Sequence, residues 1–182
     1  MRQIIFLVPL ALFLLLAGTI GWFMVESESE ERDTQTLPSV LIDRPVPDFD
    51  LPPLAGIAPG LARADLGGKP ALVNFFASWC LPCQAEHPVL MGLPAEGGVA
   101  IYGVNYKDPE ADARGWLGKL GNPYERIGVD ADGRAAIEWG VYGVPETFVI
   151  DAEGMVRYRH VGPILERDLE RTIRPLLAEL GG

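Results

Sequence analysis

The segment ASWCLPCQAEHP, residues 77–88, holds both cysteines of the 182-residue chain, Cys80 and Cys83, and is the best indication of its fold. It follows the apolar run ALVNFF, residues 71–76, and a second apolar run, VAIYGV, spans residues 99–104. Such continuous runs are typical of strands covered on both faces of a parallel sheet. We therefore expect two buried strands, with a helix that opens at the cysteines between them.

The later part of the chain adds a helix and a hairpin. Asp108 is the predicted N-cap of a helix with Pro109 in its first position, and Gly121 is expected to close it. Residues 146–162, ETFVIDAEGMVRYRHVG, predict two strands joined by a tight turn at Asp151–Gly154.

The last segment, residues 164–180, repeats apolar residues at a helical spacing, and Pro175 is expected to kink or split that helix. The order of elements is strand, helix, strand, helix, hairpin and final helix. This order indicates an α/β domain with a mixed central sheet flanked by helices.

The N-terminal region differs in character from this domain. Residues 4–25 contain no charge, and a helix of that length measures about 33 Å, enough to cross a hydrocarbon core of about 30 Å. We expect residues 1–25 to form an uncleaved transmembrane anchor. A cleaved signal peptide is the alternative, but its apolar region is shorter and ends in a small-residue cleavage site. Residues 26–44 read as an acidic, proline-containing linker, and residues 45–182 as the domain.

Charge sets the expected orientation and excludes one class of partner. Arg2 precedes the apolar run, and five acidic residues follow it between residues 26 and 33. Because positive flanks stay in the cytoplasm, the domain is expected outside, where disulfides persist. The net charge of −10 makes nucleic acid an unsuitable partner, since phosphate binding requires a basic surface.

Three roles are open to the cysteine pair. As a structural staple it would close a very small loop, worth only about 2 kcal/mol by loop entropy. As a metal site it would supply two of the four ligands of a closed zinc site, and the only histidines are His87 and His160. As a redox couple it has a positive physical argument. Cys80 would lie at a helix N-terminus, where free N–H groups and the helix dipole stabilise a thiolate.

The redox interpretation assigns different tasks to the two cysteines. Cys80, at the start of the helix, would be the nucleophile, and Cys83, one turn further in, the resolving thiol. Pro82 fits the first helical turn and stiffens the loop between them. A C-x-x-C motif within a strand–helix–strand pattern is a fairly specific signal for this chemistry.

The segment FFASWCLPCQAEHP, residues 75–88, closely resembles the active-site segment of thioredoxin-like proteins. Four further segments narrow the resemblance to the DsbE/CcmG group, the membrane-tethered thiol reductases of bacterial cytochrome c maturation. They are GVNYKD (103–108), GNPY (121–124), GVYGVPETFVID (140–151) and RYRHVGP (157–163). The resemblance covers residues 45–182 and the anchor, and it implies a thioredoxin-like fold.

The resemblance also implies a function and a location. The protein would be a single-pass protein of the bacterial inner membrane with its domain in the periplasm. It would keep the haem-binding cysteines of apocytochrome c, or a partner thiol protein, reduced. A membrane thiol–disulfide electron transporter would recharge it, and no dissociable cofactor or metal is required. A different substrate for the same kind of tethered thioredoxin remains open, as does a metallochaperone or haem-binding module.

The resemblance assigns roles around the cysteines as well. Trp79 would be a half-exposed lid over the sulfurs, with a position in the core as the alternative, and Pro145 the cis proline that faces the disulfide. Glu146 would line an acidic groove near the active site. Asp130 would either share that groove or be an ordinary loop aspartate. Two residues of the family segments have no assigned role: Asn105 and Tyr106.

Glu86 bears on the direction of electron flow. It lies three residues after Cys83, so its negative charge is expected near the sulfurs, where it would raise the cysteine pKa and favour a reductant. The alternative is a solvated charge on the helix surface. Of the other polar and aromatic residues, His87 is expected on the helix surface, and three are expected in the core: Trp116, Trp139 and Tyr142.

Overall fold

The computed structural model describes residues 9, 11–22, 39–97 and 99–181. The chain divides into two compact units, Met1–Pro38 and Ser39–Gly182. The second unit includes the predicted domain, residues 45–182, and the last residues of the predicted linker. Residues just before residue 45 pack on the domain, because the Asp43 N–H donates to the Val156 carbonyl at 2.7 Å and the Asp43 carboxylate pairs with Arg157 at 2.8 Å.

In the first unit, residues 11–22 are helical. The rest of the predicted anchor and most of the predicted linker lie outside the described residues. Within the part of the chain that the structure describes, no helix has both the length and the apolar character needed to cross a membrane.

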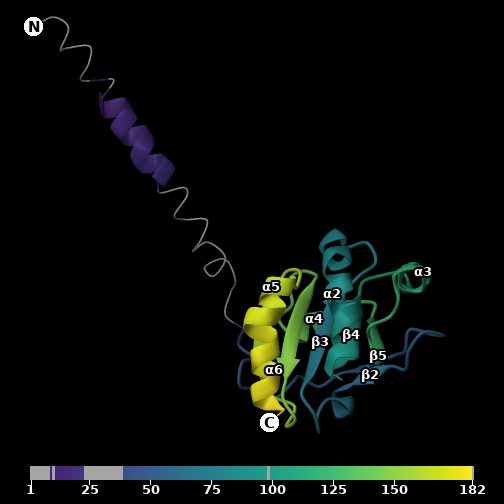
Figure 1. Cartoon of the computed structure of the whole chain (residues 1–182). Helices are drawn as coiled ribbons and strands as arrows, with labels where there is room; N and C mark the ends of the chain where they lie inside the picture. The colour runs from purple at the N-terminus through teal and green to yellow at the C-terminus, as the bar shows by residue number, and fades with distance from the viewer. Residues whose placement is uncertain (1–8, 10, 23–38, 98, 182) are drawn as a thin grey trace, which may run out of the picture. The chain divides into compact units, whose positions relative to one another are not determined.

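The second unit is built on a five-stranded mixed sheet with the order β5-β4-β3-β6-β7 (Figure 1). Strands β3 (Ala71–Phe76), β4 (Ala100–Tyr106) and β5 (Arg126–Asp130) are parallel. Strands β6 (Glu146–Ile150) and β7 (Val156–Val161) form an antiparallel hairpin. Strand β6 also pairs with β3, again antiparallel. The predicted strands and hairpin are confirmed. Strand β5 was not predicted, because RIGVD has no long apolar run and its alternation covers only five residues.

Alternate residues of β3 divide the core into two clusters, one on each face of the sheet. Leu72 and Phe76 pack in the cluster that includes residues of α2 (Leu81–Gly97), α3 (Glu110–Leu120) and α6 (Arg174–Leu180). Val73 and Phe75 pack in the other cluster, with Trp139 and the short helix α4 (Arg134–Glu138). The central strand is therefore buried on both faces, as its sequence predicts.

The C-terminal segment is helical but not uniform. It consists of α5 (Glu166–Asp168), a π-helical turn at Leu169–Ile173, and α6, with Pro175 in the first turn of α6. Since proline has no N–H to donate, the ladder of α-helical hydrogen bonds is interrupted here, which agrees with the predicted kink or split. A small sheet of β1 (Asp50–Leu51) and β2 (Leu61–Ala62), followed by a 3₁₀ turn at Arg63–Asp65, completes the unit.

The start of α3 differs from the prediction. The helix begins at Glu110 with Pro109 as its N-cap residue, so Asp108 is not the N-cap. Gly121 closes the helix as expected, at φ +93°, with its N–H donating to the Leu117 carbonyl. The Asp108 carboxylate is instead engaged by the loop that carries the cysteines.

Candidate active site

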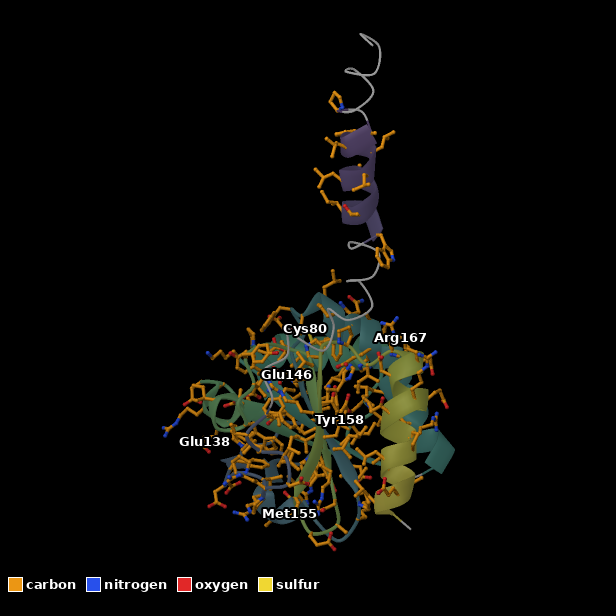
Figure 2. All side chains as sticks on the ribbon, turned by 90° about the vertical axis from the view of Figure 1, so that its left-hand side faces the viewer. Cys80, Glu138, Glu146, Met155, Tyr158 and Arg167 are labelled. Carbon is orange, nitrogen blue, oxygen red and sulfur yellow. A yellow bond between two sulfur atoms is a disulfide. The ribbon has the colours of Figure 1, made fainter. Side chains whose placement is uncertain are left out.

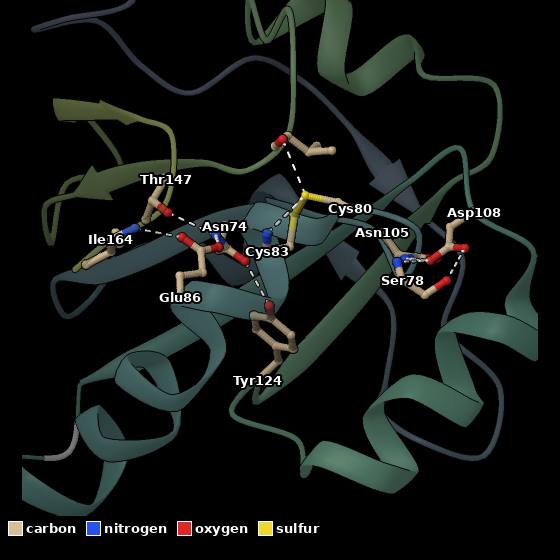
Figure 3. Close-up of a disulfide and its surroundings, with 11 residues drawn as sticks. Asn74, Ser78, Cys80, Cys83, Glu86, Asn105, Asp108, Tyr124, Thr147 and Ile164 are labelled. Atoms are coloured by element: carbon tan, nitrogen blue, oxygen red, sulfur yellow. Dashed lines mark hydrogen bonds between the residues drawn. A yellow bond between two sulfur atoms is a disulfide. The ribbon is translucent and has the colours of Figure 1, made fainter. Parts of the chain in front are cut away.

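Cys80 and Cys83 lie where β3 ends and α2 begins, and they form a disulfide with a Cα–Cα distance of 5.3 Å (Figure 3). In this oxidised form Cys80 is 4% exposed and Cys83 is 1% exposed. Figure 2 shows Cys80 and Glu146 toward one end of the domain and Met155, in the hairpin turn, at the other. The more accessible of the two cysteines is thus the one that precedes the helix.

The Cys80 sulfur has two polar neighbours. The Cys83 N–H, in the first turn of α2, points at Cys80 Sγ at 3.1 Å, and the Val144 carbonyl oxygen lies 3.4 Å from the same sulfur. In the reduced form that N–H stabilises a Cys80 thiolate, and the carbonyl can accept from a Cys80 thiol. The Val144–Pro145 peptide bond is cis, as the resemblance implies. Pro82 is exposed within the first turn of the helix.

The loop before Cys80 is held by the end of β4. The Asp108 carboxylate accepts from the Ser78 N–H at 2.6 Å, from the Ser78 hydroxyl at 2.7 Å and from Asn105 Nδ2 at 2.9 Å. The Trp79 indole N–H donates to the Lys107 carbonyl at 3.1 Å. Trp79 is 57% exposed. Asn105, which had no predicted role, therefore orients the carboxylate that fixes the cysteine loop.

Glu86 is buried, at 1% exposure, and belongs to a polar network beneath the disulfide (Figure 3). Its two carboxylate oxygens accept from Asn74 Nδ2 at 2.9 Å and from the Ile164 N–H at 3.0 Å. Asn74 Nδ2 also donates to Thr147 Oγ1 at 2.9 Å, and the Tyr124 hydroxyl donates to Asn74 Oδ1 at 2.8 Å. The alternative of a solvated surface charge is therefore wrong for Glu86.

Burial raises the pKa of Glu86 from 4.5 to about 7, against the lowering effect of the Ile164 N–H and of Asn74. The same environment raises the pKa of Tyr124 well above its usual range, through burial and then through the Glu86 charge. Glu86 is thus a group that titrates near neutral pH, one helical turn beyond Cys83. Its effect on the cysteine pKa stays a prediction.

Glu146 is fully buried and does not face an open groove. One carboxylate oxygen accepts from the Tyr142 N–H at 3.1 Å and the Gly143 N–H at 3.4 Å, and the other lies 2.7 Å from the Arg159 guanidinium. Burial raises the pKa of Glu146, while Arg159 and the two N–H groups lower it. The carboxylate therefore holds the loop that leads to Pro145.

Asp130 is also buried, and it occupies neither of the two predicted positions. Its carboxylate accepts from the Ala135 and Ala136 N–H groups at 3.2 and 2.9 Å, at the start of α4. It is therefore neither an exposed loop aspartate nor part of an open groove. Tyr106, which had no predicted role, lies under the Lys107 ammonium at 5.2 Å.

Two of the expectations for His87 and the aromatic residues are wrong. His87 is buried, with its ring 4.5 Å from that of Trp116, and burial lowers its pKa. Tyr142 is 57% exposed and not in the core. Trp139 is a core residue as predicted, and Trp116 is partly buried against the core.

Sequence reasoning missed most of the polar partners in the site. Ser78, Asn74, Thr147 and Arg159 received no role. Ser78, Asn74 and Arg159 each contact a residue that did, and Thr147 accepts from Asn74. Asn74 and Thr147 are separated by 73 residues, so no local pattern links them. The one available signal was Asn74 itself, a lone polar residue within the apolar run of β3.

Comparisons with known proteins agree with this site. The Redoxin family model matches residues 42–173. The thiol:disulfide interchange protein DsbE of Pseudomonas aeruginosa is 44% identical over 182 residues, covering 99% of this chain and 96% of that protein. DsbE of Escherichia coli K12 is 43% identical over 179 residues, covering 97% and 95%.

Solved structures show the same architecture. A secreted disulfide oxidoreductase of Mycobacterium tuberculosis, described as homologous to E. coli DsbE, superposes with a TM-score of 0.60 at 25% identity, over 73% of this chain and 96% of that one. M. tuberculosis DsbF superposes with a TM-score of 0.61 at 27% identity, over 78% and 99%. The fold is therefore thioredoxin-like.

The matches span nearly the whole chain, and the cysteine pair occupies the N-terminus of α2 with the cis-proline loop against it. The protein is a thiol:disulfide oxidoreductase with a C-x-x-C active site, and the chain belongs to the DsbE family of thiol:disulfide interchange proteins.

Proposed function

We propose that the protein is a membrane-tethered periplasmic reductase that keeps the haem-binding cysteines of apocytochrome c, or a partner thiol protein, reduced during cytochrome c maturation. The observation that carries the proposal is the Cys80–Cys83 pair, with one sulfur at the helix N-terminus against the Val144 carbonyl. The relatives support it through their name, thiol:disulfide interchange protein.

The reaction moves two electrons from the dithiol to the substrate. The Cys80 thiolate attacks one sulfur of a substrate disulfide, the substrate S–S bond breaks, and the other substrate sulfur leaves as a thiolate. Cys83 then loses its proton and attacks the Cys80 sulfur of the mixed disulfide. This step forms the Cys80–Cys83 bond and releases the second substrate thiolate, and both substrate sulfurs take up protons.

The reducing direction is supported by the surroundings of the sulfurs. A strong oxidant stabilises its thiolate, whereas an ionised carboxylate close by opposes thiolate formation. Glu86 lies on the same helix as Cys83 and has a pKa of about 7. Above pH 7 it is therefore mostly ionised and supplies that negative charge. The Cys80–Cys83 disulfide must be reduced again after each turnover, and a membrane thiol–disulfide transporter would be the source of electrons.

The proposed location rests on the N-terminal sequence. Residues 1–25 would form the anchor in the bacterial inner membrane and residues 26–44 a linker, of which the last residues pack on the domain. The uncharged stretch at 4–25, with Arg2 before it and acidic residues after it, supports a single pass with the domain in the periplasm.

The test is to trap the mixed disulfide. Cys83→Ser should form a stable covalent adduct through Cys80 with an oxidised peptide that carries a C-x-x-C-H sequence, detected by non-reducing gel and mass spectrometry. A matched peptide with Ala in place of His measures whether the haem-binding motif is recognised.

Two outcomes would contradict the proposal. An adduct with Cys80→Ser and none with Cys83→Ser would reverse the roles of the two cysteines. Equal trapping of both peptides, and of unrelated disulfide peptides, would favour a tethered thioredoxin with a different substrate.

A further inference from the structure

Arg159, on β7, binds three parts of the active-site loop at once. Its guanidinium lies 2.7 Å from the Glu146 carboxylate, and its Nη2 donates to the Gly140 carbonyl at 3.0 Å. The same group lies 4.9 Å from the centre of the Tyr142 ring, at a distance suited to a cation–π contact. The Arg159 and Glu146 side chains are 6% and 1% exposed, so their ion pair is shielded from water, whereas Gly140 and Tyr142 are exposed.

The pairing of the hairpin explains how Arg159 reaches Glu146. In the β6–β7 register Glu146 is opposite Val161 and Phe148 is opposite Arg159. Arg159 and Glu146 are therefore diagonal neighbours on one face of the sheet, within reach of a long side chain. The guanidinium also lies 5.9 Å from the centre of the Phe148 ring.

These contacts close a clamp around residues 140–146. Arg159 holds the Gly140 carbonyl at one end of the segment and Glu146 at the other, and Glu146 in turn accepts from the N–H groups of Tyr142 and Gly143. The clamped segment carries the Val144 carbonyl, 3.4 Å from Cys80 Sγ. It also presents the exposed ring of Tyr142, which has the Arg159 guanidinium against it.

We propose that Arg159 is a positioning residue for disulfide exchange, which fixes the loop at 140–146 against Cys80 and holds the exposed Tyr142 ring as a contact for a polypeptide substrate. The inference rests on exchange at Cys80–Cys83 and on a polypeptide substrate, and not on which protein that substrate is. Small thiols need no alignment along the loop, whereas a peptide disulfide does.

A lysine cannot replace this side chain. The planar guanidinium donates along several directions in one plane and stacks on a ring, whereas an ammonium is a compact point charge. Arg159→Lys therefore keeps a positive charge beside Glu146 but loses the simultaneous contacts with the Gly140 carbonyl and the Tyr142 ring. Arg159→Lys thus tests the loss of the positioning contacts while the positive charge beside Glu146 is kept.

Arg157 provides a matched control on the same strand. Its guanidinium pairs with Asp151 at 2.6 Å and with Asp43 at 2.8 Å, toward the hairpin turn and away from Cys80. Arg157→Lys removes a comparable pair of contacts from the same β-hairpin. A general loss of hairpin rigidity would therefore appear in both variants, and a loss of positioning only in Arg159→Lys.

The experiment measures the rate of exchange with a disulfide-bonded peptide and with dithiothreitol for each full-length variant. For Arg159→Lys the ratio of kcat/KM for the peptide to the dithiothreitol rate should fall about tenfold, mainly through a higher KM, because docking is impaired. For Arg157→Lys the ratio should stay within about twofold of the wild type, since its partners Asp151 and Asp43 lie away from Cys80 and outside the loop at 140–146.

A double variant tests whether the effect of Arg159→Lys comes only from an unpaired buried charge that disturbs folding. Arg159→Met combined with Glu146→Gln leaves no unpaired charge in the core and should show the same fall in the ratio. Tyr142→Ala should lower it too, and the effects of Tyr142→Ala and Arg159→Lys should be less than additive, because they disrupt one contact.

An unchanged ratio in Arg159→Lys and in the double variant, or full additivity with Tyr142→Ala, would overturn the inference. A wild type that exchanges with dithiothreitol but with no peptide disulfide would overturn the proposed function and this inference with it.

Discussion

At the scale of single residues, Glu86 is the group whose surroundings change its chemistry most. Its burial beside Asn74 and Tyr124 places its pKa at about 7. Both carboxylate oxygens accept hydrogen bonds from N–H donors, which favour the ionised form. The pKa is raised nonetheless, because the cost of burying the charge exceeds what these two hydrogen bonds offset.

This shift makes stability depend on pH. Because the pKa of Glu86 is raised on folding, the folded state binds a proton between pH 4.5 and 7 that the unfolded state has lost. The contribution of Glu86 to the free energy of unfolding is therefore fully present below pH 4.5, and it is lost as the pH rises through 7. A shift of this size corresponds to about 3 kcal/mol. We expect Glu86→Gln to abolish this part of the pH dependence, measured by guanidinium unfolding of the oxidised protein at pH 5 and pH 8.

The matched control is Glu138→Gln, which changes an exposed carboxylate on α4 and should leave the pH profile of the wild type intact. Comparison of variants also cancels the opposite contribution of His87, whose buried ring has a lowered pKa. An identical pH slope in the wild type and Glu86→Gln would show that Glu86 is ionised throughout this range.

At the scale of elements, the cysteine loop depends on the turn between β4 and α3. Asp108 receives three hydrogen bonds there, two from Ser78 and one from Asn105. Lys107, whose carbonyl accepts from Trp79, adopts a φ of +44°, a left-handed conformation that is unusual for a residue with a side chain. The turn is therefore shaped by its contacts with the loop and not by local preference.

Replacing the Asp108 carboxylate should loosen this connection. Asp108→Asn keeps the size of the side chain but replaces one acceptor oxygen with an NH₂ group, which leaves Ser78 or Asn105 without a partner. We expect a loss of about 2 kcal/mol in the free energy of unfolding, measured in urea, together with altered Trp79 fluorescence. The control is Asp112→Asn, at an exposed position in α3, and equal stabilities of the two variants would contradict this account.

The elements predictable from the sequence are those with a strong local signal. The apolar runs of β3 and β4 and the hairpin turn at Asp151–Gly154 located four of the five strands. Strand β5 and helix α4, of five residues each, are too short for a periodic pattern, and they are positioned by long-range pairing and by Asp130. Helix α3 starts after Asp108 because that carboxylate is used by a loop 30 residues away.

Long-range contacts also limit what the sequence predicts of the site. The cysteines and their helix follow from residues 77–88 alone. The buried positions of Glu86 and His87 do not, since the segment QAEHP is locally polar and is covered only when the C-terminal segment and α3 pack on α2. The exposure of Tyr142 likewise depends on Arg159, which lies 17 residues further along the chain.

At the scale of the whole molecule, the second unit contains the complete redox site. The disulfide, its cis-proline loop and the Glu86 network all lie within Ser39–Gly182. A reductase of this kind works only if the reduced pair gives up electrons readily, so its midpoint potential decides whether the protein reduces or forms disulfides.

The measurement that tests this most directly is the Cys80–Cys83 midpoint potential, by equilibration of residues 39–182 with glutathione or dithiothreitol buffers at pH 7. We predict a value in the reducing range, closer to the roughly −270 mV typical of thioredoxin than to the roughly −120 mV of a strong oxidant. A potential near the oxidant end would show that the protein forms disulfides, and it would contradict the proposed role in cytochrome c maturation.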